Sequence, residues 1–273
     1  MQHVNLRGIF SAVVTPFDAA LRPDSRTAIP YYRDLLSSGC DGLNILGTTG
    51  EAMSVGIGDR LAFMEAVSEA LPRDRLIVGT GAAALDDAAR LTRAALELRF
   101  AAALIIPPFY FRDVGDEGIV RFFDALFSRV DPPAASVVLY NFPRMSGITL
   151  HADLVDQLIR AFPGTIAGVK DSSNTLELER EIHARHPDLA VFPGSEALLG
   201  QARADGFAGC ISGSVCLWPQ LAARAWREGL PDDCERIAEL RESLSSRPLI
   251  QAVRLRIAQE TRDPSWLRTM PPV

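Results

Sequence analysis

Residues 136–170 read SVVLYNFPRMSGITLHADLVDQLIRAFPGTIAGVK and contain a complete strand–helix–strand pattern. Two short and mostly apolar runs, 136–140 and 165–170, flank an amphipathic segment at 151–161. Strands that are apolar on both faces are typical of a parallel sheet covered by helices. The stretch therefore predicts two parallel strands joined by a helical crossover.

The same alternation continues along the whole chain. Further strand-like runs occupy 8–15, 42–46, 75–79, 102–107, 189–194 and 208–212, and helical patterns occupy 27–38, 57–71, 86–99, 116–129, 174–186, 196–204 and 218–228. Eight such units in 273 residues predict a (β/α)8 TIM barrel over 1–230, with a C-terminal helical extension of the same domain at 231–273. The alternative is a doubly wound open sheet, but its G-x-G-x-x-G turn is missing after the first strand.

Composition narrows the class of protein. The chain is 48% apolar and 23% charged, which is typical of a folded globular protein. Its 28 basic residues are outnumbered by 34 acidic ones, and the net charge of −6 argues against a nucleic-acid partner. No apolar run reaches the roughly 18 residues that a membrane span requires. The N-terminal segment lacks the features of a secretion signal, so we expect a cytoplasmic protein without membrane contacts.

One residue stands out from the basic ones. Lys170 is the only lysine in the chain, and the other 27 basic residues are arginine. Lysine can act as a neutral nucleophilic amine, whereas arginine stays protonated. Lys170 also ends a predicted strand, and barrel active sites lie at the carboxyl ends of the strands. Asp171 follows directly, but consecutive strand residues point to opposite faces, so we expect no ion pair between them.

Neighbouring strand ends carry hydroxyl groups. The second strand runs into Gly-Thr-Thr-Gly-Glu at 47–51, and the fifth ends at Tyr140. In a barrel, Thr48, Tyr140 and Lys170 would converge on one small volume. A desolvated amine there can attack the ketone of a 2-oxo acid and form an imine. A phenol that is hydrogen-bonded to a threonine hydroxyl can move the protons that this reaction requires. The backbone N–H groups of the Thr-Thr turn suit a small carboxylate.

Other classes of function stay open at this point. The four histidines lie away from the strand ends and lack metal-ligand spacing, so we expect neither a metal nor a cofactor. A pyridoxal-phosphate enzyme would also use a lysine imine, but it would need a phosphate-binding glycine loop. A barrel that only binds a sugar acid is the second alternative. It would not need the amine.

Four sequence blocks carry a resemblance to a known family. GTTGE at 47–51, PFY at 108–110, YNFP at 140–143 and GVKDS at 168–172 resemble signature blocks of the dihydrodipicolinate synthase and N-acetylneuraminate lyase family. The resemblance implies a (β/α)8 barrel with a C-terminal helical extension, a homotetramer or other homo-oligomer, and pyruvate chemistry through a lysine imine.

The resemblance also implies roles for individual residues. The implied roles are the Schiff-base lysine for Lys170, the phenol beside it for Tyr140, the proton relay for Thr48, the carboxylate contact for Thr49, a phenol lent to the neighbouring subunit for Tyr110, and the pocket lining for Gly194 and Ile211. All of them lie at or just after a predicted strand end.

One position departs from part of the family. The lysine-pathway synthases carry an arginine five residues after the tyrosine, where it binds the carboxylate of the second substrate. Here that position is Met145, with Arg144 one residue earlier. We therefore predict a lyase or aldolase that joins pyruvate to an aldehyde or cleaves a 2-oxo-3-deoxy sugar acid. The alternative is a dihydrodipicolinate synthase that condenses pyruvate with aspartate semialdehyde and uses Arg144.

Overall fold

The computed structural model describes residues 6–173 and 175–273, and its eight parallel strands form a nearly closed barrel. The strands are β1 (Gly8–Ala12), β2 (Gly42–Ile45), β3 (Leu76–Gly79), β4 (Ala102–Ile105), β5 (Val137–Asn141), β6 (Ile166–Asp171), β7 (Ala190–Pro193) and β8 (Gly209–Ser212). Ladders join them in the order β7-β6-β5-β4-β3-β2-β1-β8. A backbone hydrogen bond of 3.0 Å from Ala208 N–H to the Val191 carbonyl links the two ends of this order. The predicted TIM barrel is confirmed.

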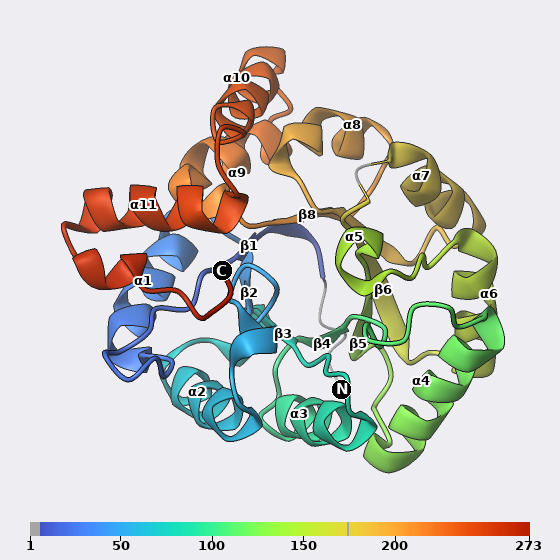
Figure 1. Ribbon diagram of the computed structural model, residues 1–273. Coiled ribbons are helices and arrows are strands. Elements are labelled where there is room, and N and C mark those ends of the chain that lie inside the picture. The colour runs from blue at the N-terminus through green and yellow to red at the C-terminus, as the bar shows by residue number, and fades with distance from the viewer. Residues whose placement is uncertain (1–5, 174) are drawn as a thin grey trace.

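Helices surround the strands on the outside, as Figure 1 shows. They are α1 (Ser25–Ser37), α2 (Ile57–Ala70), α3 (Leu85–Glu97), α4 (Asp116–Val130), α5 (Pro143–Ser146), α6 (Ala152–Ala161), α7 (Leu176–Arg185), α8 (Leu199–Ala204), α9 (Pro219–Arg227), α10 (Pro231–Glu242) and α11 (Leu249–Thr261). The last two follow the final strand–helix unit and lie outside the ring. Within the described residues, no helix combines the length and the apolar character that crossing a bilayer requires.

Most predicted boundaries differ from the structure by one to three residues, including those of the first helix, the first strand and the segment at 196–204. Helix α1 begins at Ser25 rather than 27, because the Asp24 carboxylate caps it by accepting from the N–H groups of Arg26 and Thr27. The first strand ends at Ala12 rather than 15, although the Val13 N–H still donates to the Asn44 carbonyl at 3.1 Å. The predicted helix at 196–204 is a 3-10 turn, η3 (Glu196–Leu198), followed by α8.

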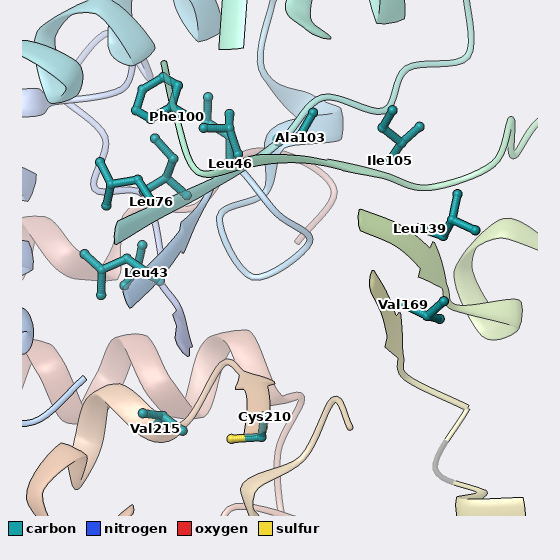
Figure 2. Packing of buried hydrophobic residues seen from close by; sticks show 14 of the residues in the cluster. Leu43, Leu46, Leu76, Phe100, Ala103, Ile105, Leu139, Val169, Cys210 and Val215 are labelled. Atoms are coloured by element: carbon teal, nitrogen blue, oxygen red, sulfur yellow. The ribbon is translucent and has the colours of Figure 1, made fainter. Parts of the chain in front are cut away.

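The strands separate two layers of core. Outward-facing strand residues such as Leu43, Leu139 and Val169 pack with the helices in one large cluster, part of which Figure 2 shows. Inward-facing residues such as Val138 and Phe192 fill the barrel in a second cluster. Because successive strand residues point to opposite faces, the residue after Leu139 and the residue after Val169 both face the barrel interior.

A buried carboxyl group lies in the outer layer. Glu179 of α7 is 1% exposed, and one of its oxygens, Oε2, has no hydrogen-bond partner among the described residues. Burial raises the pKa of Glu179 from its ordinary value of 4.5 to about 8, and the negative charge of Asp171 adds to the rise. This side chain is therefore protonated in the folded protein at neutral pH.

The free energy of unfolding should depend on pH through Glu179. Between pH 4.5 and about 8 the folded chain holds a proton that the unfolded chain has lost, so this contribution to stability falls as the pH rises through that window. Glu179→Gln cannot ionise and should be more stable than the wild type at about pH 9, with little difference at about pH 4. Denaturant unfolding across this range measures the effect.

The matched control is Glu177→Gln, which removes the same charge from an exposed position on the same helix. Because the charge of Glu177 contributes only weakly to the raised pKa of Glu179, this variant should leave the pH dependence of the wild type nearly unchanged. Identical pH profiles for the two variants would contradict the assignment of the raised pKa to Glu179.

Candidate active site

The register of β5 and β6 brings Tyr140 beside Lys170. The two residues are direct partners in the parallel ladder, and both lie near the carboxyl ends of their strands. Lys170 Nζ lies 4.4 Å from the centroid of the Tyr140 ring. The side chains are nearly enclosed, with 4% of Lys170 and 5% of Tyr140 exposed. An amine in such a position is shielded from bulk water and approaches the phenol face.

The neighbouring residues tie the same two strand ends together on the outer face. Asn141 Nδ2 donates to Asp171 Oδ1 at 2.5 Å. Asp171 also accepts from the backbone N–H and the hydroxyl of Ser173, at 3.1 and 2.5 Å. Burial raises the pKa of Asp171, and these hydrogen bonds oppose the rise. Asp171 thus has partners on the outer face, as strand alternation predicts, and does not pair with Lys170.

The loop after β2 supplies the next hydroxyl groups. Thr48 Oγ1 lies 3.4 Å from the Tyr140 hydroxyl, a long hydrogen bond of the kind common before substrate binds. Thr49 lies against the β8 loop, because a Cβ placed on Gly213 would sit 2.8 Å from Thr49 Oγ1. The structure therefore brings Lys170, Tyr140 and Thr48 together, with Thr49 next in the loop.

Two residues predicted to line the pocket occupy the strand ends nearby. Ile211 of β8 is fully buried and belongs to the same inner cluster as Tyr140. Gly194 directly follows β7, where a Cβ would lie 2.8 Å from the backbone oxygen of Asp171 and would also meet the Ser172 side chain. Its missing side chain is what lets the loops after β6 and β7 approach each other.

The candidates Tyr110 and Arg144 lie on the surface, as does Met145. Tyr110, in the loop between β4 and α4, is 78% exposed and stacks edge-on against exposed Phe111, with 5.2 Å between ring centroids. Within one chain the structure does not bring Tyr110 to Lys170. Arg144 and Met145 are exposed on the short helix α5, which the sequence analysis did not predict. Arg144 makes no ion pair within the described residues.

Two buried carboxylates at the strand ends were missed by the sequence analysis. Glu51 ends the loop after β2 and pairs with Arg254, which is 203 positions away in the sequence. Glu196 follows β7 and accepts from the hydroxyls of Ser212 and Ser214. Glu51 is part of the GTTGE block, but no local sequence pattern indicates that its partner comes from α11.

Comparison with known proteins agrees with this geometry. Residues 5–258 match the Dihydrodipicolinate synthetase family. The chain belongs to this family. It is therefore a lyase, and the predicted membership is confirmed.

Two curated relatives illustrate the range of activities in the dihydrodipicolinate synthetase family. An uncharacterised DapA-like lyase of Chloroflexus aurantiacus is 36% identical over 217 residues, covering 79% of this chain and 72% of the relative. An N-acetylneuraminate lyase of Salmonella paratyphi B is 29% identical over 246 residues, covering 86% and 81%. Both relatives are named as lyases, but the two names do not give a common substrate.

Two solved structures of this family superpose closely. Dihydrodipicolinate synthase from Agrobacterium tumefaciens gives a TM-score of 0.91 at 32% identity, covering 97% of this chain and 92% of that one. A prophage protein of the family from E. coli K12, solved in complex with pyruvate, gives a TM-score of 0.83 at 26% identity, covering 98% and 92%. The likeness extends over the barrel and the C-terminal helices.

The close approach of the β6 and β7 loops predicts a stability difference between two glycines. Gly194→Ala would place a methyl group against backbone, and such overpacking costs about 1–3 kcal/mol. Gly58→Ala, on the exposed first turn of α2, meets nothing within 4 Å and should be neutral or stabilise by up to about 1 kcal/mol. Denaturant unfolding of both variants tests the contrast. Equal stabilities would contradict the proximity inferred at Gly194.

Proposed function

We propose that this lyase forms or cleaves a carbon–carbon bond between pyruvate and an aldehyde, through an imine on Lys170. The observation that carries the proposal is the enclosed Lys170 amine, 4.4 Å from the Tyr140 ring centroid, with the Thr48 hydroxyl next to the Tyr140 hydroxyl. An amine that served only as a charge would need no such pair of proton-carrying groups beside it.

The cleavage direction can be written with every atom accounted for. Lys170 Nζ attacks the ketone carbon of the 2-oxo acid, and water leaves to give a protonated imine. The substrate's C4 hydroxyl loses its proton to the Tyr140 and Thr48 relay, the C3–C4 bond breaks, and its electron pair is taken up by the imine to give an enamine. The aldehyde leaves, the enamine accepts a proton at C3, and water releases pyruvate and free Lys170. The lysine itself supplies the electron sink, so the proposed cycle needs no added cofactor.

The carboxylate of the 2-oxo acid needs its own contact. We assign it to Thr49 and the backbone N–H groups of the loop after β2, with Gly194 and Ile211 lining the same end of the barrel. The support is the place of Thr49 in the loop after β2, of Gly194 directly after β7 and of Ile211 in the inner cluster with Tyr140, together with the pyruvate complex of the 26% identical E. coli prophage protein. Oriented N–H and hydroxyl groups favour a bound carboxylate.

The proposal also includes a homo-oligomer, either a dimer or a tetramer. Tyr110 and Phe111 expose most of their ring surfaces, and exposed aromatic pairs are typical of surfaces that another subunit covers. In this arrangement Tyr110 would supply its phenol to the active site of a neighbouring copy rather than to its own.

For the second substrate we favour an aldehyde that carries no carboxylate, as released from a 2-oxo-3-deoxy sugar acid. Met145 stands where the resemblance places a carboxylate-binding arginine in the synthases. A charge-assisted hydrogen bond of that kind is worth about 1.5–3 kcal/mol. Two observations favour the synthase as the second candidate: Arg144 is exposed and free of an ion pair in the described residues, and the Agrobacterium synthase is 32% identical.

Borohydride reduction in the presence of pyruvate tests the imine. We expect one pyruvate-derived group on the chain, located on Lys170 by peptide mass spectrometry, because reduction makes the imine permanent. Lys170→Arg keeps the charge but cannot supply a neutral amine, so it should lose both the adduct and turnover.

With a single lysine in the chain, the α-amine at the N-terminus is the rival position for the adduct. An unmodified wild-type chain, or an adduct that persists in Lys170→Arg, would contradict the proposed chemistry. If the adduct forms but pyruvate methyl protons do not exchange into deuterated water, the chain binds 2-oxo acids without turning them over.

A substrate panel tests the second substrate. We expect kcat/KM for cleavage of one or more 2-oxo-3-deoxy sugar acids to exceed that for condensation of pyruvate with aspartate semialdehyde. Met145→Arg should raise the condensation rate by about 10- to 100-fold through the restored charge-assisted hydrogen bond.

The matched variant is Arg144→Ala, which removes the neighbouring exposed arginine. It should leave cleavage within a few-fold of the wild type. A wild-type condensation rate far above every cleavage rate, abolished by Arg144→Ala and not improved by Met145→Arg, would establish the synthase instead.

A further inference from the structure

Glu51 has an unusual backbone conformation for a residue with a side chain. Its φ is +56°, in the left-handed region that residues other than glycine rarely adopt. Its N–H donates to the Thr48 carbonyl at 3.0 Å, and the next N–H, of Ala52, donates to the Gly47 carbonyl at 3.3 Å. The position of Glu51 thus closes the tight turn that carries Thr48 and Thr49.

The Glu51 side chain is held from the C-terminal part of the chain. Its carboxylate accepts from Arg254 Nε at 2.7 Å, and it also contacts Arg254 Nη2. The second carboxylate oxygen accepts from the backbone N–H of Met270 at 2.7 Å. Figure 1 shows the C-terminus next to β1 and β2, where these contacts are made. Glu51 therefore joins the active-site turn to both α11 and the last residues of the chain.

Arg254 secures a second loop at the same time. Its Nη2 donates to the Thr15 carbonyl at 2.7 Å, its Nη1 donates to the Trp266 carbonyl at 3.0 Å, and its guanidinium lies 5.2 Å from the centre of the Phe17 ring. The Thr15 hydroxyl also packs against the Thr48–Thr49 turn, since a Cβ placed on Gly50 would be 2.9 Å from it. The turn is held by Arg254 through Glu51 on one side and through Thr15 on the other.

A buried ion pair is a poor way to stabilise a fold. Arg254 and Glu51 are 1% and 4% exposed, and removing two charges from water costs much of what their attraction returns. Well-packed apolar residues could fill the same volume with equal or better stability. What the pair adds is a fixed geometry, because a guanidinium with several N–H groups holds the carboxylate and two carbonyl groups in place at once.

We propose that Glu51 and Arg254 are positioning residues, through which the C-terminal helix α11 holds the Thr48–Thr49 turn against Tyr140. The inference rests on the proposed function, in which Thr48 moves a proton with Tyr140 and Thr49 holds the substrate carboxylate. Thr48 Oγ1 already lies 3.4 Å from the Tyr140 hydroxyl, so a small displacement of the turn would break the relay. Displacements of about 1 Å can cost about 100-fold in rate.

The test uses two variants of the full-length chain. Glu51→Gln with Arg254→Gln removes both charges and keeps amide groups that can hydrogen-bond, which avoids leaving one charge buried alone. Arg254→Lys keeps a charge opposite Glu51 but cannot reach all three oxygen partners together. The matched control is Arg224→Gln with Asp233→Asn, which removes an exposed arginine–carboxylate pair between α9 and α10, away from the turn.

Each variant is measured well below its melting temperature for the adduct on Lys170, for exchange of pyruvate methyl protons, and for KM and kcat. We expect the Gln/Gln variant to keep the adduct at saturating pyruvate, to lose about 10- to 100-fold in proton exchange and kcat, and to raise the KM for pyruvate. Arg254→Lys should lose less than the Gln/Gln variant. The control pair should match the wild type in every rate.

The outcomes separate the two proposals. If the wild type forms no adduct and exchanges no protons, the proposed function fails before the variants are compared. If the wild type is active and the folded Gln/Gln variant matches it in rate and KM, the positioning role is overturned. If the Gln/Gln variant does not fold, Arg254→Lys decides: wild-type exchange and KM overturn the role, and reduced exchange with the adduct retained supports it.

Discussion

The placement of Tyr140 against Lys170 depends on the parallel register of β5 and β6. A slip of one residue would turn one of the two side chains into the helix layer and would bring its outward-facing neighbour into the barrel. The hydrogen bond from Asn141 to Asp171 joins the same two strands one residue further on, at the opposite face. This polar contact outside the barrel interior therefore reinforces the register that aligns the inner pair.

Arginines of the C-terminal extension reach the ends of two strands. Arg254 of α11 contacts Glu51 after β2, and Arg241 of α10 has its Nε 4.0 Å from Glu196 after β7. Glu196 also accepts from the hydroxyls of Ser212, the last residue of β8, and Ser214, so it bridges the strand ends where the barrel closes without a ladder. The extension is thus attached to the barrel at the loops around the candidate site. A chain whose basic residues are nearly all arginine is suited to such contacts, because each guanidinium can bond several oxygens.

The charged groups on the two sides of β6 have different surroundings. On the inner side, Lys170 lies over the ring of Tyr140, whose hydroxyl is 3.4 Å from Thr48 Oγ1. On the outer side, Asp171 and Glu179 lie close enough that the charge of Asp171 raises the pKa of Glu179. Because Glu179 is protonated at neutral pH, this part of the outer layer holds one negative charge fewer than its composition suggests.

The sequence by itself determined the eight strand–helix units and the position of the single lysine at a strand end, because both are local patterns of apolar and polar residues. Since the carboxyl ends of parallel strands share one edge of a barrel, it also predicted that Thr48, Tyr140 and Lys170 would meet. The pairing of Glu51 with Arg254, and the packing of Gly194 against the β6 loop, were decided by the tertiary structure alone. Their partners are distant in sequence or are backbone atoms, and neither kind of contact leaves a periodic signal. Nor does local sequence distinguish Arg254 from the other arginines, because burial and partners arise only when α11 packs beside the barrel.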